Sequence, residues 1–172
     1  VGEALELARR VAGRAKVVAL LVDPDDALVS DVMRQVGPDI VQLHGSETPE
    51  RVAAIKALAG VAVMKAIKVE TKSDAAAALA YKDIADLILF DAKAPKGAVL
   101  PGGNGIAFDW HALEDVAPRV DYMLSGGLTP ENVAAAIRLT GAKAVDVSSG
   151  VEKAPGEKDT ALIHAFIAAA KA

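Results

Sequence analysis

Short apolar runs that alternate with longer, alanine-rich segments most constrain the fold of this 172-residue chain. Each run is apolar on both faces, which is typical of parallel strands covered by helices on both sides rather than of half-exposed strands. We expect six such strands, over residues 16–22, 39–43, 61–67, 86–90, 120–124 and 143–147.

The segments between the runs have the period of amphipathic helices, and two carry clear start signals. Thr48-Pro49-Glu50 and Thr129-Pro130-Glu131 each place a capping hydroxyl before a proline and an acid in the first turn. The sequence therefore predicts one α/β domain over residues 1–172, built from repeating βα units. Its helices are expected over residues 3–12, 26–36, 49–58, 73–81, 109–116, 130–139 and 159–170.

Composition excludes several classes of protein. The chain contains no cysteine, so it has no disulfide framework and no thiolate metal site. A net charge of −4 offers no electrostatic footprint for nucleic acid or for an anionic membrane. No apolar run approaches the ~18 residues of a membrane helix. We therefore expect a soluble, cytoplasmic, compact domain. With three separated histidines and no cysteine, no metal site is indicated.

The position of the glycine-rich loops distinguishes two architectures of repeating βα units. An open nucleotide-binding sheet carries its phosphate loop after the first strand. Here that loop is Asp23-Pro24-Asp25-Asp26, which has no glycine and would repel phosphate. The glycine-rich loops instead follow the last two expected strands, as in barrels whose phosphate site lies after strands 7 and 8. They are Ser125-Gly126-Gly127 and Ser148-Ser149-Gly150.

If the last two expected strands are strands 7 and 8 of a barrel, the first expected strand of this chain is strand 3. The helix that precedes it is then helix 2. The sequence thus predicts a parallel (βα)8 TIM barrel in partial form, with strands 3–8 and helices 2–8 and without the first β-α-β stretch. Complete barrels have about 200 residues or more. A chain of 172 residues is therefore consistent with a barrel that lacks one β-α-β stretch.

The two glycine-rich loops predict an anion site. Glycines at strand ends let a phosphate approach backbone N–H groups, and the serines add hydroxyl donors. Ordinary tight turns are the alternative, but two successive loops at the same strand ends favour phosphate. A sugar phosphate is preferred over a dinucleotide, because no GxGxxG follows the first strand. The candidate phosphate-binding residues are Gly126, Gly127, Ser148, Ser149 and Gly150.

Asp91 is the candidate general acid. It ends an expected strand on the face shared by Leu87 and Leu89, and apolar surroundings favour a protonated carboxyl. A loop-capping role is the alternative. The loop of residues 92–108 that follows is long enough to be an active-site cover or a disordered segment.

Other polar residues have less specific patterns. Gln42 and His44 share a face at a strand end, where His44 either polarises a substrate oxygen or makes a structural hydrogen bond. Lys65 is either a buried, paired lysine or, less favoured, a Schiff-base lysine. Asp146 is placed to orient a neighbouring strand or loop. His111 and His164 fall in helical segments and are expected at the surface or in packing.

Five motifs in order carry a family resemblance. They are Val41-Gln42-Leu43-His44-Gly45, Leu89-Phe90-Asp91-Ala92-Lys93, Gly102-Gly103-Asn104-Gly105 with Phe108-Asp109-Trp110, Leu124-Ser125-Gly126-Gly127-Leu128, and Asp146-Val147-Ser148-Ser149-Gly150-Val151-Glu152. Each motif alone is weak, but the ordered set resembles the phosphoribosylanthranilate isomerases, (βα)8 barrels of tryptophan biosynthesis. The resemblance runs from Val1 to the C-terminus.

The resemblance implies an Amadori rearrangement of N-(5'-phosphoribosyl)anthranilate without a cofactor. Asp91 matches the family's general acid, which protonates the ribose ring oxygen and opens the ring to a Schiff base. Gly126, Gly127, Ser148 and Ser149 match positions that hold the substrate phosphate. Gln42 and His44 match the strand-4 motif near the substrate and take a supporting role.

The chain also departs from the family pattern. The family's general base is a cysteine on strand 1, and an arginine after strand 2 helps to bind the anthranilate carboxylate. Since this chain has no cysteine, we expect it to be about the last three quarters of the enzyme and not to catalyse the reaction alone. We also expect possible self-association through an open barrel edge.

Two alternatives stay open at this point. One is another sugar-phosphate barrel. An indole-glycerol-phosphate synthase would need a catalytic lysine, for which Lys65 is the only candidate and a weak one. A ribulose-phosphate epimerase would need metal ligands, which are not evident in the sequence. The other is a non-catalytic barrel fragment that binds a phosphorylated ligand or a partner chain.

Overall fold

The computed structural model describes residues 2–11, 13–93 and 107–172. The described residues form two compact units, the first within Val1–Ala66 and Ala80–Leu87, the second within Ile67–Leu79 and Ile88–Ala172. The predicted motif Gly102-Gly103-Asn104-Gly105 and most of the predicted loop of residues 92–108 lie outside the described residues.

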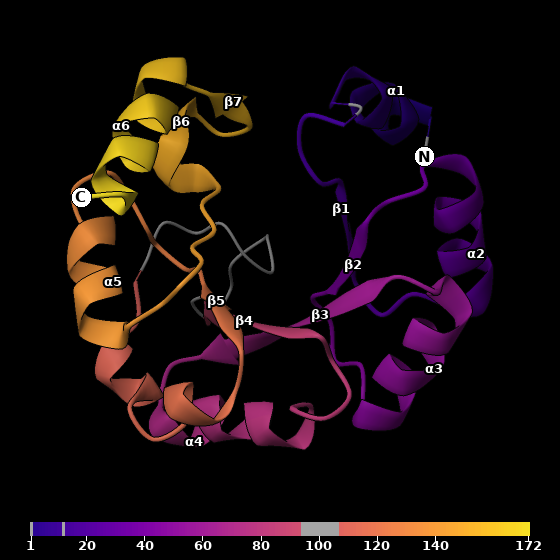
Figure 1. The fold of residues 1–172 in the computed structure, drawn as a ribbon, viewed down its shortest axis with the longest axis horizontal. Helices are drawn as coiled ribbons and strands as arrows, with labels where there is room; N and C mark the ends of the chain where they lie inside the picture. Colours follow the sequence, from indigo (N-terminus) through magenta and orange to yellow (C-terminus); the bar gives the residue numbers. More distant parts are fainter. Residues whose placement is uncertain (1, 12, 94–106) are drawn as a thin grey trace. The chain divides into compact units, whose positions relative to one another are not determined.

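The first unit alternates strands and helices (Figure 1, indigo to magenta). Strands β1, β2 and β3 pair in parallel, with Leu21 opposite Leu43 and Leu43 opposite Lys65. The C-terminal ends of β1 and β2 therefore lie side by side, next to Lys65. The elements are α1 (Gly2–Val11), β1 (Val18–Leu21), α2 (Asp26–Gln35), β2 (Ile40–Leu43), α3 (Pro49–Ala59) and the beginning of β3 (Ala62–Val69).

Helices α2 and α3 pack on the strands of this unit through one apolar cluster. The cluster joins residues of both helices to β2 and β3, and all of its members are fully buried. Burying each such side chain contributes about 1.5–3 kcal/mol, so the cluster holds the strand ends in a fixed place. Its members are Val29, Val41, Leu43, Val52, Ile55 and Val63.

Capping side chains set the starts of the two helices. Asp25 accepts a hydrogen bond from the N–H of Leu28 over 2.8 Å and begins α2. Thr48 accepts one from the N–H of Arg51 over 3.3 Å and begins α3, with Pro49 in the first turn. The predicted cap at Thr48 is confirmed, and it places the residues before it at the end of β2.

The second unit begins with the end of β3, at residue 67. Strand β4 (Leu87–Ala92) pairs in parallel with β5 (Tyr122–Leu124), with Phe90 opposite Leu124. Helices α5 (Val133–Thr140) and α6 (Thr160–Ala170) follow. The shorter elements are α4 (Lys72–Ala76), the 3-10 helices η1 (Ala77–Ala80), η2 (Trp110–Leu113), η3 (Ala117–Arg119) and η4 (Ser149–Val151), and the strands β6 (Glu152–Ala154) and β7 (Glu157–Lys158).

The sixth predicted strand, residues 143–147, is not a strand in the structure. Only Val145 pairs, with Leu124 of β5, through hydrogen bonds from the N–H of Leu124 to Ala144 O and from the N–H of Asp146 to Leu124 O. Strand β5 is only three residues long, which leaves little backbone for a longer ladder. The antiparallel hairpin of β6 and β7 was not predicted.

Three predicted helices also differ from the structure. Residues 109–116 form only the 3-10 turn η2. The helix predicted over residues 73–81 divides into α4 and η1. Helix α5 begins at Val133 rather than Pro130, because the Asn132 side chain takes the N–H of Thr129 and holds residues 129–132 in a turn.

Among the described helices, none is long and apolar enough to cross a membrane.

Candidate functional site

Asp91 lies near the C-terminal end of β4 and is 5% exposed. Leu89 and Phe90 before it are completely or almost completely buried, and the Phe90 ring packs against Tyr122 of β5 with centroids 5.4 Å apart. One carboxylate oxygen of Asp91 accepts a hydrogen bond from the N–H of Ala92 over 2.9 Å. The packed strand pair therefore presents this carboxyl at a strand end, where the sequence predicts it.

The first glycine-rich loop lies directly against the end of β4. The N–H of Ser125 donates to Phe90 O over 2.7 Å, and Ser125 Oγ donates to Asp146 Oδ2 over 2.9 Å. Gly126 has a φ of 85°. A Cβ at Gly126 would overlap the backbone N of Ala92, the residue after Asp91. Only glycine permits this approach, so the structure brings the candidate acid and the first loop together.

The second glycine-rich loop meets the first through backbone. A Cβ on Gly150 would overlap the carbonyl oxygen of Leu128, which follows Gly127 in the first loop. Gly126, Gly127, Ser148, Ser149 and Gly150 therefore belong to two loops in contact within one unit. This arrangement can present N–H and hydroxyl donors from both loops to a single anion.

Two residues that the sequence reasoning missed hold these loops in shape. Asn132 donates from Nδ2 to Gly127 O over 2.9 Å, while its Oδ1 accepts from the N–H of Thr129. Lys158 Nζ donates to Ser148 O over 2.9 Å and to Ser148 Oγ over 3.2 Å. An asparagine just before a helix is a known local signal, whereas the hairpin that carries Lys158 had none in the sequence.

Lys158 also pairs with Glu152, the last residue of the DVSSGVE motif. The Nζ–Oε1 distance is 2.6 Å. Hydrogen bonds from Lys158 and from the N–H of Gly156 lower the pKa of Glu152 below its ordinary value. The acid therefore stays ionised and keeps Lys158 next to Ser148.

Gln42 and His44 lie together at the end of β2 in the first unit. Both are buried, with exposures of 9% and 6%. Gln42 Nε2 lies 3.1 Å from His44 Nδ1, so the two side chains share one face as predicted.

Lys65 is a buried, paired lysine, as the preferred interpretation predicts. Its Nζ lies 2.8 Å from Glu47 Oε2 and 2.8 Å from Gly45 O. Burial opposes ionisation of Glu47, but hydrogen bonds from Lys65 and from the N–H of Asp23 outweigh it and lower the pKa of Glu47. The sequence reasoning did not single out Glu47.

The remaining histidines are surface residues, as expected. His111 is exposed and its Nδ1 lies 2.8 Å from Asp109 Oδ1, and His164 is exposed on α6. In the described part of the chain, no group of three or more His, Cys, Asp or Glu side chains could hold a metal ion.

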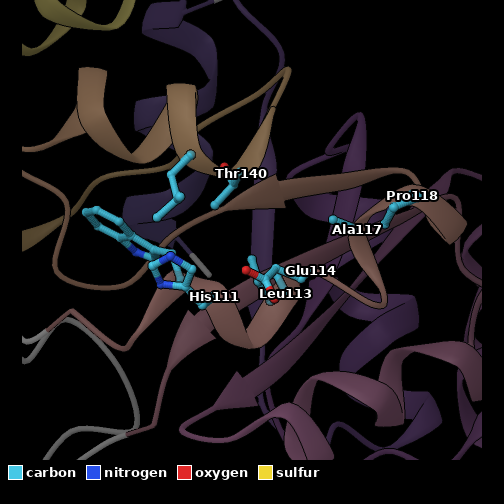
Figure 2. A pocket seen from close by; sticks show the side chains of 8 residues that line it. His111, Leu113, Glu114, Ala117, Pro118 and Thr140 are labelled. Carbon is cyan, nitrogen blue, oxygen red and sulfur yellow. The ribbon is translucent and has the colours of Figure 1, made fainter.

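A pocket of the second unit lies elsewhere. Figure 2 shows its side chains, which include His111 and Leu113 of η2 and Thr140 at the end of α5. None of the predicted site residues lines it, so it does not contribute to the candidate acid or the phosphate loops. The lining residues are Trp110, His111, Leu113, Glu114, Ala117, Pro118, Leu139 and Thr140.

Comparison with known sequences identifies the relatives of this chain. The family model for N-(5'-phosphoribosyl)anthranilate (PRA) isomerase matches residues 3–169. The N-(5'-phosphoribosyl)anthranilate isomerase of Rhodopseudomonas palustris strain BisA53 is 56% identical over 171 residues, which cover 99% of this chain and 78% of that protein. The enzyme of Rhizobium meliloti strain 1021 is 53% identical over 169 residues, covering 98% and 79%.

Solved structures agree with the sequence relatives and confirm the predicted barrel class of fold. The phosphoribosylanthranilate isomerase of Thermotoga maritima has a TM-score of 0.87 at 37% identity, covering 99% of this chain and 80% of that one. An isomerase in complex with reduced 1-(o-carboxyphenylamino)-1-deoxyribulose 5-phosphate has a TM-score of 0.84 at 34% identity, covering 99% and 78%. This chain therefore belongs to the phosphoribosylanthranilate isomerase family, the family that its ordered motifs resemble.

Proposed function

We propose that this chain acts in tryptophan biosynthesis on N-(5'-phosphoribosyl)anthranilate, the substrate named for its relatives, and needs no cofactor. One observation carries the proposal: the two glycine-rich loops meet at Gly150 and Leu128, and the first of them lies on Ala92 beside Asp91. The proposed phosphate loops and the proposed acid belong to one unit, and a sugar-phosphate isomerase needs both groups.

The loops take the substrate phosphate. Gly126, Gly127 and Gly150 carry no side chain over their peptide groups, so a phosphate can reach the N–H donors. Ser148 and Ser149 add hydroxyl donors to the charged oxygens, and such charge-assisted bonds are stronger than neutral ones. The ligand in the related crystal structure is itself a 5-phosphate.

Asp91 opens the ribose ring. Its carboxyl gives a proton to the ring oxygen as the C1–O bond breaks, and the nitrogen lone pair forms the C1=N bond of the Schiff base. A proton must then leave C2, and its electron pair forms the enamine that becomes the ketose. In the family pattern a cysteine is the base that removes this proton. The 172 residues contain no cysteine, so we assign no base within the chain. Gln42 and His44 contact the substrate in a supporting role.

Binding of the reduced product analogue tests the proposal. Titration of the purified chain with reduced 1-(o-carboxyphenylamino)-1-deoxyribulose 5-phosphate should show binding that inorganic phosphate competes away. Removing both loop hydroxyls, as Ser148→Ala with Ser149→Ala, should weaken it roughly tenfold or more, because hydrogen bonds to charged groups contribute about 1.5–3 kcal/mol each.

Ser30→Ala is the matched control, since Ser30 is an exposed residue of α2. It should bind the analogue as tightly as the unchanged chain. No binding of the analogue, or equal losses in the loop variant and the control, would overturn the proposed phosphate site.

Two further parts of the proposal concern the surroundings of the protein. We place it in the cytoplasm, with its small-molecule substrate.

Self-association is proposed through β1, which among the described residues pairs only with β2 and exposes Val18 by 43% and Leu20 by 54%. Sedimentation over a range of concentrations tests it, and a monomer at all concentrations would contradict it.

A further inference from the structure

Lys65 and Glu47 form a buried ion pair that the proposed chemistry does not use. Their side chains are 3% and 1% exposed, and Nζ lies 2.8 Å from Oε2. Taking two charges out of water costs more than such a pair usually returns, unless further hydrogen bonds satisfy both groups. The other partners of the pair therefore indicate what it does.

The ion pair holds both polar groups of the Gly45 backbone. Lys65 Nζ donates to Gly45 O over 2.8 Å. The N–H of Gly45 in turn lies 3.1 Å from each carboxylate oxygen of Glu47. Gly45 directly follows His44, so the buried anion holds the peptide group between His44 and Gly45, and the buried cation holds the next one, between Gly45 and Ser46.

Glu47 extends the same contacts to the loop after β1. Its Oε1 accepts a hydrogen bond from the N–H of Asp23 over 2.8 Å, and Asp23 Oδ1 accepts one from the N–H of Ser46 over 2.6 Å. A Cβ on Gly45 would overlap Asp23, so the two loops approach as closely as backbone allows. Asp23 is also the only non-glycine residue with positive φ in the described part of the chain, at 45°.

Tyr81 completes the surroundings of the pair. Its hydroxyl donates to Glu47 O over 2.9 Å, and its ring centroid lies 5.8 Å from Lys65 Nζ. Glu47 therefore connects the loop after β1, the loop after β2 and strand β3, all within the first unit. Gly45, whose backbone the pair holds, directly follows the predicted site residue His44.

We propose that Glu47 and Lys65 are positioning residues that fix Gln42 and His44 for substrate binding. Charged groups make the strong hydrogen bonds that hold a peptide in one orientation. Fixing the peptide group between His44 and Gly45, and the one after it, fixes the direction of the backbone at His44, and His44 Nδ1 lies 3.1 Å from Gln42 Nε2. This inference rests on the proposed function, in which Gln42 and His44 contact the substrate.

The test uses Glu47→Gln and the double variant Glu47→Gln with Lys65→Met, with two readouts. The double variant removes both charges, so it remains informative if the single change leaves Lys65 unpaired and the protein unfolded. The first readout is the ring signals of His44 in NMR spectra of the full chain. The second compares binding of the reduced product analogue with binding of inorganic phosphate.

We expect His44 ring signals to shift and analogue affinity to fall about tenfold, while phosphate affinity changes less than about twofold. Phosphate alone reports on the two glycine-rich loops, to which neither Glu47 nor Lys65 belongs. Glu114→Gln is the control, since Glu114 belongs to an exposed ion pair with Lys72 at 3.2 Å. It should change neither readout.

The outcomes separate this inference from the proposed function. If the unchanged chain binds no analogue, the proposed function fails, and the His44 signals still report whether the pair positions that side chain. If the chain binds the analogue but folded variants keep both its affinity and the His44 signals, the pair is only structural and the inference is overturned.

Discussion

A Cβ on Gly150 would overlap the carbonyl oxygen of Leu128, so the two glycine-rich loops of the second unit meet backbone to backbone. This contact joins the loop after β5 to the loop that precedes the β6–β7 hairpin. A Cβ on Gly126 would likewise overlap the backbone N of Ala92, the residue after Asp91. Both loops are therefore held near Asp91 by close contacts at which only glycine fits.

Gly150→Ala should therefore separate the two loops. We expect the free energy of unfolding to fall by about 1–3 kcal/mol, because the methyl group meets backbone that has no rotamer with which to yield. Binding of the reduced product analogue should weaken as well. Urea denaturation and titration measure the two effects.

Gly2→Ala is the control for this change, because a Cβ at Gly2 meets nothing within 4 Å. It should leave binding unchanged and stability equal or slightly higher, since alanine favours the helix by up to about 1 kcal/mol. A Gly150→Ala chain as stable and as competent as the Gly2→Ala chain would show that the contact between the loops is dispensable.

Asp91→Asn should remove the acid without disturbing the phosphate loops. The amide oxygen can still accept the hydrogen bond from the N–H of Ala92. General acids typically contribute about 10²- to 10⁴-fold. We therefore expect the rate of ribose-ring opening, after the uncatalysed rate is subtracted, to fall by that factor. Reduction of the Schiff base traps the opened ring and measures this rate.

Affinity for the reduced product analogue should change less than about twofold in Asp91→Asn, since the analogue needs no proton transfer. Asp83→Asn, at an exposed position, serves as the control. Equal rates of ring opening in the unchanged chain and in Asp91→Asn would remove Asp91 from the mechanism.

Acid should destabilise the first unit through Glu47. The pKa of Glu47 is lowered in the folded protein from its ordinary value of 4.5, because hydrogen bonds from Lys65 and Asp23 outweigh the opposing effect of burial. A lowered folded pKa stabilises the protein at pH values above the unfolded pKa. This stabilisation is lost as the pH falls below 4.5 and through the lower folded value.

Glu47→Gln should flatten this part of the pH dependence, even though it lowers stability at neutral pH. Urea denaturation at neutral pH and at a series of acidic values measures the slope. Glu6→Gln, an exposed change on α1, should keep the slope of the unchanged chain. Parallel curves for Glu47→Gln and the unchanged chain would contradict the prediction.

Asp86 should matter for stability more than its position on the surface suggests. Its Oδ2 accepts a hydrogen bond from the N–H of Val63 over 2.9 Å, and its Oδ1 lies 2.8 Å from Lys56 Nζ. Asp86→Ala leaves the N–H at the start of β3 without this partner and should cost about 1–2 kcal/mol. The salt bridge itself is half-exposed and adds little.

Asp83→Ala provides the comparison for Asp86→Ala, since Asp83 has only a loose contact with Lys82 at 3.9 Å. It should change stability by less than about 0.5 kcal/mol. Thermal or urea denaturation measures both variants, and equal stabilities would mean that the Asp86 hydrogen bond to Val63 contributes nothing.

Local signals predicted much of the fold. The first five apolar runs are strands, and Thr48 begins α3, because apolar patterning and capping act over a few residues. The same reasoning was wrong for Thr129, where Asn132 competes for the backbone and delays the helix. It was also wrong for residues 143–147, because a strand needs a partner long enough to pair with it.

The site shows the same division. The candidate residues were chosen by their place at strand ends, which residue types and spacing predict. Lys158 and Asn132, which hold the loops, and Glu47, which holds Gly45, were not singled out, because each acts on groups brought near by folding. Asp23 and Glu47 are 24 residues apart, and no local pattern connects them.

By itself the sequence determined the repeating βα order, the barrel class of fold and the isomerase family, because hydrophobic period and short motifs are properties of neighbouring residues. Only the tertiary structure decided that Gly150 meets Leu128, that Gly126 meets Ala92 and that a buried ion pair holds Gly45. Such contacts depend on the register of paired strands and on close packing, which no local segment of the chain specifies.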